Sequence, residues 1–478
     1  MASHSTWNPL QQFIDEIHLF ITGQLPVKPS NLIKQNKDHL HENGEFSFSN
    51  KRKVWLSHMS SSRQEAAGFC VDVNCKHNET LFIDDTNDAN SSKATTSTST
   101  TTDDDDKNDG KTDCGKHDSH SHYTVTKLLS SNSFALHVAR VKIVGDWCNV
   151  FLDRRKCYAE IFRKVLDNEK TKEKGQGCKS ILITRDDDGK SIDGAQSVTD
   201  YRLQLLESVI KNLINQSDYW VLVQQSDEQK TTKPIRVHLT TKSSAIVASD
   251  TRKIVSGIVV DPKNGNKLAA VTTDDYVKKR STDMQLMAQH KYGLRVRNEA
   301  VFVALIKQLG LAAVTVDFME VRHSSPVGLN VSGCSTSKGA SFILYNSARI
   351  ETILRKFHER VACGYYNALP ELSDIDISQL SEEEEWQMLI VYVAGYENLI
   401  DKSLADIENG RIAPHLVCNF LCGLVGLFSI YYRRCRILVE NRSQLMPQLF
   451  ARIYLIKCIQ KTLNNALALL NIDPVTQM

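Results

Sequence analysis

The spacing of hydrophobic positions changes along the chain, from mixed signals in the first two thirds to helical signals in the last third. Residues 10–21 repeat apolar positions every three or four residues, which predicts a short amphipathic helix. Residues 134–152 read as two strands around a turn at Gly145-Asp146, and a helix is expected over 158–166. These elements indicate an N-terminal α+β domain.

Strands and helices alternate in the middle of the chain. Such alternation is typical of a mostly parallel, Rossmann-like sheet, here of modest size. The apolar runs predict a strand at 180–184, a helix at 201–213, and strands at 219–224, 234–239 and 254–260.

Strand signals end near residue 341, and the remaining pattern is helical. The last segment is the clearest, because Leu449, Ile453, Ile456 and Ile459 recur at helical spacing after Pro447. The predicted helices span 342–361, 382–400, 413–433 and 446–470. The expected fold is therefore multidomain α+β and α/β, with an N-terminal α+β domain, a reduced Rossmann-like α/β layer and a C-terminal all-α helical bundle.

A polar stretch interrupts the first domain at residues 84–122. It contains a Ser/Thr tract and ten Asp against four Lys, with almost no apolar residues. Such a segment cannot offset the entropy of ordering, so the sequence predicts a disordered acidic insertion. The predicted domains are 1–168, which includes this insertion, 175–340 and 341–478.

Composition narrows the class of protein. The 478 residues carry a formal net charge of only +2, with 41% hydrophobic residues, as in chains that bury real cores. The 12 cysteines show no dense regular spacing, so we expect reduced thiols in a cytoplasmic protein, with the nucleus as a second compartment. Residues 416–432 are apolar but too short for an ordinary membrane span, which favours a buried bundle helix and no membrane partner.

The near-zero net charge hides two basic regions. Residues 229–310 hold 15 Lys/Arg against six acids, and residues 410–478 hold eight against two. A polyanion such as RNA is the natural partner of such regions, because each neutralised phosphate releases counterions. Ordinary solvated lysines remain the alternative. Nearby tyrosines could stack on unpaired bases or simply fill the core, namely Tyr345, Tyr365, Tyr366, Tyr431 and Tyr432.

Catalytic and metal-binding motifs are weak. The sequence contains no GxxxxGK[ST], GxSxG or HExxH motif, and no GxGxxG in a strand–turn–helix context. Cys418 and Cys422 share a helical face, where packing thiols are expected rather than ligands. A cluster of cysteines and histidines near the insertion lacks the paired spacing of zinc ligands, so we expect no metal site there. We also expect no cofactor. The members of the cluster are Cys70, Cys75, His77, Cys114, His117, His120 and His122.

The C-terminal residues resemble the DALR anticodon-binding domain of arginyl-tRNA synthetases. The resemblance is carried by Ala451-Arg452, Leu455, Lys457, Leu463, Asn465, Leu467, Leu470-Asn471-Ile472 and Met478. Residues 344–350 and 353–356 are similar to the first bundle helix of that family, and 141–152 to the end of its N-terminal tRNA-corner-binding domain. Residues 309–314 look like the strand that closes its catalytic domain.

The departures from this family concern catalysis. A class I synthetase needs HIGH-type and KMSKS-type motifs, which stabilise the triphosphate during adenylate formation. Residues 186–197 contain no His-x-Gly-His, and residues 261–273 lack the lysine-rich loop. Ser335–Gly339 mimics a KMSKS fragment but stands in the wrong place, just before the first bundle helix. The sequence therefore resembles non-catalytic relatives of arginyl-tRNA synthetase.

This resemblance implies a tRNA-binding adaptor without chemistry of its own. It would recognise arginine tRNAs and deliver them to a methyltransferase-like enzyme that makes 3-methylcytidine in the anticodon loop. The bundle would grip the anticodon arm, and α/β-layer cations could follow phosphates, although Arg349 and Arg452 could equally be structural ion-pair partners. The candidate bundle residues are Tyr345, Arg349, Arg355, Arg433, Arg434, Arg436, Arg452, Lys457 and Lys461, and the others are Lys278, Lys279 and Arg280.

Two other functions stay open. The chain could be a divergent arginyl-tRNA synthetase that still activates arginine, although its missing motifs argue against this. It could also be a scaffold that binds only protein through its helical bundle.

Overall fold

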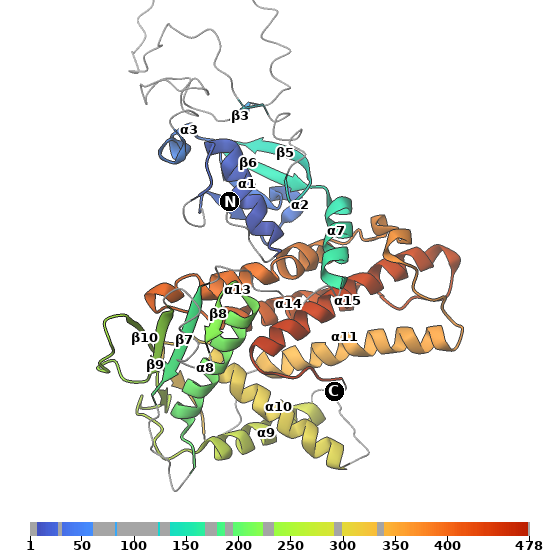
Figure 1. The fold of residues 1–478 in the computed structure, drawn as a ribbon. Coiled ribbons are helices and arrows are strands. Elements are labelled where there is room, and N and C mark those ends of the chain that lie inside the picture. The colour runs from blue at the N-terminus through green and yellow to red at the C-terminus, as the bar shows by residue number, and fades with distance from the viewer. Residues whose placement is uncertain are drawn as a thin grey trace, which may run out of the picture. The chain divides into compact units, whose positions relative to one another are not determined.

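A computed structural model shows that the chain forms two compact units, residues 9–160 and residues 161–478 with 1–8 (Figure 1). We call them the N-terminal and the C-terminal unit. The predicted insertion at 84–122 lies outside the described residues. The structure describes residues 7–26, 31–60, 82–83, 123–124, 134–167, 179–186, 195–222, 234–290, 299–331 and 339–476.

The N-terminal unit is a four-stranded antiparallel sheet with helix α1 (Pro9–Thr22) against it. Helix α1 places Phe13 and Ile17 in the core, and the Phe13 ring lies 4.8 Å from that of Phe46. The strands predicted within 134–152 are confirmed as a hairpin that turns at Gly145 (φ +55°). The sheet order is β1 (Ile33–Gln35), β2 (Phe46–Ser49), β6 (Trp147–Leu152), β5 (Val138–Val144); the remaining elements are α2 (Leu40–Asn43), α3 (Arg52–Trp55), β3 (Phe82–Ile83) and β4 (Tyr123–Thr124).

Two glycines of this unit differ in the space around them, so substitution by alanine should destabilise the protein to different extents. Both Gly44 and Gly145 have positive φ, which costs an L-residue about 1–2 kcal/mol. A Cβ at Gly44 would also lie 2.3 Å from the carbonyl oxygen of Val150, whereas a Cβ at Gly145 meets nothing within 4 Å. We expect Gly44→Ala to lower the free energy of unfolding by clearly more than Gly145→Ala, in thermal denaturation followed by circular dichroism. Equal losses would contradict this.

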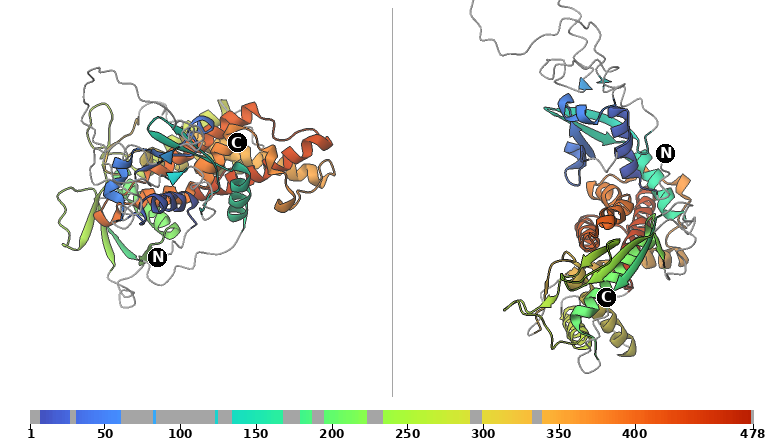
Figure 2. Two further views of the ribbon diagram at one scale, coloured as in Figure 1. Left: turned by 90° about the horizontal axis from the view of Figure 1, so that it is seen from above. Right: turned by 60° about the vertical axis from the view of Figure 1, so that its left-hand side comes forward.

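The C-terminal unit begins within helix α7 (Arg154–Leu166) and continues into a four-stranded sheet in which all neighbours are parallel (Figure 1, Figure 2). The predicted Rossmann-like layer is therefore confirmed. Helix α8 (Val198–Gln216) packs on it through a buried apolar stripe, and its first turn is capped by the side chain of Ser197. The sheet order is β10 (Thr251–Val255), β9 (Ile235–Thr240), β7 (Ser180–Arg185), β8 (Trp220–Leu222).

Two antiparallel helices, α9 (Thr273–His290) and α10 (Glu299–Met319), follow the sheet and pack on each other. The strand expected at 309–314 is wrong, because these residues lie inside α10. An uninterrupted apolar run has no periodicity that separates a buried strand from a buried helix, and its two alanines favour the helix. A short parallel pair, β11 (Val259–Val260) and β12 (Val327–Gly328), lies beyond β10, so the strand expected at 254–260 is in fact two.

The last third is a helical bundle, as predicted from its pattern. Helix α11 crosses beneath α14 and α15 in Figure 1, and its apolar face is buried against them. The helix expected at 382–400 is divided by a π-helical stretch, Met388–Val393. The bundle helices are α11 (Gly339–Ala362), α12 (Glu383–Gln387), α13 (Tyr396–Leu404), α14 (His415–Arg434) and α15 (Met446–Leu469).

Two helices, α10 over 300–319 and α14, are long and apolar enough to cross a membrane by length and composition. Core helices of water-soluble proteins meet the same criterion. In the structure both pack against other helices of the C-terminal unit. The residues of α10 from Ala312 to Met319 are all buried in that unit.

Candidate nucleic-acid interface

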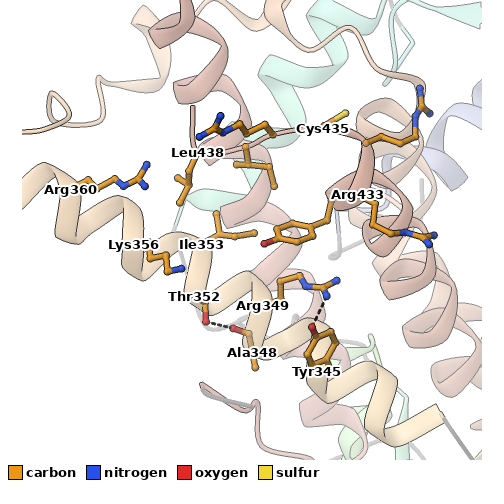
Figure 3. A pocket seen from close by; sticks show the side chains of 14 residues that line it. Tyr345, Ala348, Arg349, Thr352, Ile353, Lys356, Arg360, Arg433, Cys435 and Leu438 are labelled. Atoms are coloured by element: carbon orange, nitrogen blue, oxygen red, sulfur yellow. Dashed lines mark hydrogen bonds between the residues drawn. The ribbon is translucent and has the colours of Figure 1, made fainter. Parts of the chain in front are cut away.

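A cleft of about 570 Å³ lies between helix α11 and the segment that ends α14 (Figure 3). One wall is made by α11 residues and the other by residues 432–438. The lining is strongly basic, with five arginines and one lysine. The lining residues are Tyr345, Ala348, Arg349, Thr352, Ile353, Lys356 and Arg360 on α11, and Tyr432, Arg433, Arg434, Cys435, Arg436, Ile437 and Leu438 opposite.

Helical spacing explains how α11 builds its wall. Tyr345, Arg349, Thr352, Lys356 and Arg360 follow one another at steps of three or four residues, so they share one face. The neighbouring face carries the buried apolar stripe that packs on the bundle. A single amphipathic helix thus anchors itself and presents a polar, cationic row to the cleft.

Arg349 is held between two tyrosine rings at one end of the cleft. Its guanidinium carbon lies 4.4 Å from the ring centre of Tyr345 and 4.5 Å from that of Tyr432. It also donates hydrogen bonds to the Tyr345 hydroxyl at 2.8 Å and to the Asn346 amide oxygen at 3.1 Å. Such cation–π contacts fix the guanidinium without neutralising its charge. The stack joins α11 to the end of α14.

Arg360 marks the other end of the cleft. It donates a hydrogen bond of 2.7 Å to the hydroxyl of Tyr366, and its guanidinium lies 5.5 Å from the ring centre of Tyr365. Tyr366 is buried and in turn donates to the carbonyl oxygen of Val439. These contacts fasten the end of α11 to the segment that forms the opposite wall.

The opposite wall carries three exposed arginines in the space of four residues. Arg433 and Arg436 make no ion pair with any described carboxylate. Arg434 differs, because it forms an ion pair with Glu384 and lies 3.7 Å from Glu382. Of the three, Arg433 and Arg436 are therefore the ones whose charge is left for a ligand.

Apart from that of Arg434, the positive charge of the cleft is uncompensated. Among the described residues, Arg349, Lys356, Arg360, Arg433 and Arg436 form no salt bridge, and no carboxylate lines the cleft. Cations that are grouped without counter-charges raise the local positive potential and attract anions. The rim also exposes aromatic surface, since Tyr432 is 40% exposed. Such a site can bind phosphates together with a planar group.

Four of the predicted bundle residues lie elsewhere. Arg355 is exposed on another face of α11 and pairs with Glu359 at 2.9 Å. Lys457 is half-buried beside the ring of Tyr454, and Lys461 donates to the carbonyl oxygen of Val165 at 2.6 Å. Arg452, the fourth, is buried. Of the nine predicted bundle residues, the cleft therefore brings together Tyr345, Arg349, Arg433, Arg434 and Arg436.

Arg452 holds the bundle together from inside. Its Nε donates to the carboxylate of Glu385 at 2.8 Å, and its Nη1 donates to the carbonyl oxygen of Arg436 at 3.2 Å. The same carboxylate accepts a 2.7 Å hydrogen bond from the buried hydroxyl of Tyr431. Burial alone would lower the pKa of Arg452, but the neighbouring Tyr431 and Glu385 raise it above its usual value. Arg452 could contact RNA or form a structural ion pair, and its burial favours the structural ion pair.

Among the α/β-layer cations, Arg280 is also internal. It is fully buried on α9 and lies 2.7 Å from Asp317 and 3.1 Å from Asp283. Lys279 pairs with Asp283 at 2.8 Å, whereas Lys278 is exposed. The three do not form a continuous basic track, because only Lys278 presents its charge openly to solvent.

Sequence reasoning missed Thr352, Lys356 and Arg360 as cleft residues. The signal was present, because all three continue the helical spacing that starts at Tyr345 and Arg349. Each lies three or four residues from the next one along the same face.

Within the described residues, no group of three or more His, Cys, Asp or Glu side chains is placed to hold a metal ion. The cysteine–histidine cluster weighed near the insertion lies outside those residues. On α14, Cys418 is buried and Cys422 is exposed, so the two thiols have different surroundings. The prediction of packing thiols is confirmed for Cys418 and wrong for Cys422, whose side chain is exposed on the helix surface.

The thiols should differ in reactivity. Burial raises the pKa of Cys148 and of Cys157 to about 12 and raises the pKa of Cys418 further, so these thiols are protonated near neutral pH. We expect iodoacetamide at pH 8 to label the exposed Cys363 well before these three, as read by peptide mass spectrometry. In urea all four should react alike. Early labelling of Cys418 in the native protein would contradict the packing described here.

Residues 343–478, which contain the whole cleft, match the family model of the DALR anticodon binding domain. The "DALR anticodon-binding domain-containing protein 3" of Danio rerio is 31% identical over 214 residues, which cover 42% of this chain and 38% of that protein. The "Arginine--tRNA ligase" of Geotalea daltonii is 33% identical over 137 residues, 29% of this chain and 22% of the ligase. The matches thus span two fifths or less of these curated relatives. The expected resemblance is confirmed: residues 343–478 match the DALR anticodon binding domain, and part of the chain is similar to arginine–tRNA ligases.

The arginyl-tRNA synthetase of Plasmodium falciparum aligns with 71% of this chain and 86% of its own, with a TM-score of 0.47 and 10% sequence identity.

Proposed function

We propose that this protein binds tRNA through the cleft between α11 and the end of α14. The observation that carries the proposal is a row of uncompensated cations flanked by tyrosines, set inside a domain that matches an anticodon-binding family. Phosphates would be bound by Arg433 and Arg436 from one wall and by Lys356 and Arg360 from the other. Unpaired bases of a loop could stack on the exposed Tyr432.

A narrower role rests on the sequence resemblance. We propose that the protein is a cytoplasmic adaptor, and a pseudoenzyme, which recognises arginine tRNAs and presents them to a methyltransferase that forms 3-methylcytidine in the anticodon loop. Its relation to arginine–tRNA ligases supports the choice of tRNA, and its missing HIGH-type and KMSKS-type motifs support a role without catalysis. In such a role the cleft contributes affinity and register, not chemistry.

Binding can be tested with the purified chain and labelled tRNA at two salt concentrations. We expect a dissociation constant that rises steeply with salt, because several phosphates release counterions. Arginine tRNAs should bind more tightly than a tRNA of another specificity with the same length. Absent or salt-independent binding would instead support the protein-only scaffold.

The adaptor role has its own test. The chain is added to a purified 3-methylcytidine tRNA methyltransferase with an arginine tRNA, and the modified base is measured by mass spectrometry. We expect the chain to raise the rate for arginine tRNAs and to leave the rate for other substrates of the enzyme unchanged. A uniform effect, or none, would contradict the adaptor while leaving tRNA binding intact.

The competing enzyme would need a nucleotide site at the carboxyl ends of the parallel strands, where open α/β sheets bind ligands. There the described side chains bond to one another: Asp186 accepts hydrogen bonds from Thr240 and, at 2.9 Å, from His238. These bonds lower the pKa of Asp186 and keep a carboxylate, which repels phosphate, at this edge. An ATP–pyrophosphate exchange assay with arginine and tRNA decides the matter. Robust exchange would contradict the adaptor role and show that the protein is a divergent synthetase.

A further inference from the structure

Two exposed tyrosines stand at opposite ends of the basic cleft. Among the phenylalanine, tyrosine and tryptophan side chains that the structure describes in the C-terminal unit, Tyr365 and Tyr432 are the two that are exposed, at 42% and 40%. Each lies beside an arginine of the cleft. The guanidinium of Arg360 is 5.5 Å from the ring centre of Tyr365, and at the other end Arg349 is 4.5 Å from that of Tyr432. Exposed aromatic rings are enriched where a protein binds a ligand, so this shared placement points to one ligand that meets both.

The Tyr365 ring is held in place from both ends. Its backbone N–H and that of Tyr366 donate to the carbonyl oxygen of Arg360 at 2.8 Å and 3.0 Å, after a turn in which Gly364 has a φ of +74°. Its hydroxyl accepts a hydrogen bond of 3.3 Å from the backbone N–H of Asn441, which follows the opposite wall in the chain. The Tyr366 ring supports it at 5.0 Å between ring centres. A base that stacks on a ring already held in this way pays little ordering entropy.

The distance between the two ends suits a single strand of RNA. Arg349 and Arg360 are eleven positions apart on α11, which is about 17 Å along the helix axis (Figure 3). This is about five steps at the 3.4 Å spacing of stacked nucleotides, and fewer steps where the strand is extended. Lys356 lies between the two arginines in the lining of the cleft, where it can meet a phosphate. Bases of a duplex are paired and stacked inside it, so only unpaired bases can stack on both rings.

We propose that Tyr365 is a second base-stacking residue of the cleft, so that the cleft binds an unpaired RNA segment of about four to six nucleotides with one base on Tyr432 and another on Tyr365. This inference rests on the proposed function of the cleft. Phosphates between the two stacked bases would meet Lys356 from one wall and Arg436 from the other. Every base has a π-face, so Tyr365 would contribute affinity and a length requirement rather than a choice of sequence.

The test uses the full chain and oligouridine strands of three and eight nucleotides in fluorescence anisotropy. Tyr365→Leu keeps an apolar side chain but removes the π-face. We expect it to weaken binding of the eight-nucleotide strand at least about fivefold. The three-nucleotide strand should lose less than about twofold, because it reaches only one end of the cleft and can still use Tyr432.

Two control variants separate stacking from a structural role. Tyr365→Phe removes the hydroxyl that accepts from Asn441 but keeps the ring, so it should bind both strands within about twofold of the wild type. Trp147→Leu changes an exposed aromatic side chain of the N-terminal unit and should leave both affinities unchanged.

Three results would overturn the second stacking residue: no loss in Tyr365→Leu, an equal loss for both strands, or an equal loss in Tyr365→Phe. A loss of the same size in Trp147→Leu would overturn it too, because stacking would then not depend on the cleft. All of these leave the proposed function standing if tRNA still binds and still depends on Arg433 and Arg436. If the wild type bound neither tRNA nor the eight-nucleotide strand, the proposed function and this inference would fail together.

Discussion

Replacing Arg433 and Arg436 together by glutamate should weaken tRNA binding by at least about tenfold. Both side chains are exposed, line the cleft and lack a described carboxylate partner, so their charge is available to phosphate. Loss of two contacts should also reduce the slope of log K against log salt by about 1.4. Arg434 is left in place, because its ion pair with Glu384 would confound the result. Gel-shift titrations at several salt concentrations provide both numbers.

Arg411→Glu is the control at a distant exposed arginine. The Arg411 side chain is 78% exposed, and its pair with Asp406 at 3.5 Å lies at the surface, where such pairs contribute at most about 1 kcal/mol. Arg411 lies before α14, whose 20 residues put it about 30 Å from the cleft end of that helix. It should change tRNA affinity little, and both variants should melt like the wild type. If Arg411→Glu weakened binding as much as the double change, net charge would be the cause and the cleft would lose its assignment.

Replacing Arg452 by methionine should lower the free energy of unfolding by about 3–5 kcal/mol. The change leaves the Glu385 carboxylate fully buried beside Tyr431 without its cation, and isolated buried charges are costly. It also removes the donor to the Arg436 carbonyl, which positions the basic wall of the cleft. Chemical denaturation followed by circular dichroism gives the value.

Two further variants test whether the loss of stability comes from the buried pair of Arg452 and Glu385. Arg355→Met breaks the exposed pair with Glu359 and should cost less than about 1 kcal/mol. Adding Glu385→Leu to Arg452→Met should recover part of the loss, since the second change removes the unpaired charge. If Arg452→Met lowered the free energy of unfolding as little as Arg355→Met, the buried pair would contribute little to stability. Contact of Arg452 with RNA would then become the better explanation of its presence.

The fold was predictable wherever one residue spacing dominated. The hairpin at Gly145, the parallel strands and the helix over 446–470 each follow from a clear period. The strand expected at 309–314 failed because its residues are apolar at every position, and such a run has no periodicity that separates a strand from a helix. The π-helical stretch at 388–393 was also out of reach, because it depends on packing rather than on local preference.

The cleft was only partly predictable for a similar reason. The sequence marks cations, but burial decides which of them meet solvent: Arg433 is exposed, whereas Arg452 and Arg280 are enclosed with carboxylates. Their partners, Glu385 and Asp317, lie 67 and 37 residues away, a separation that no local pattern reveals. Lys356 and Arg360 were within reach, because helical spacing alone puts them beside Arg349.

The absence of carboxylates among the described residues of the cleft also sets how fast a ligand arrives. A field that is not cancelled locally extends about 8 Å into solution at physiological ionic strength, which steers polyanions before they touch the protein. Added salt should therefore slow association more than it speeds dissociation. The Tyr345–Arg349–Tyr432 stack acts only at contact distance, so its loss should shorten the lifetime of the complex and leave the encounter rate nearly unchanged.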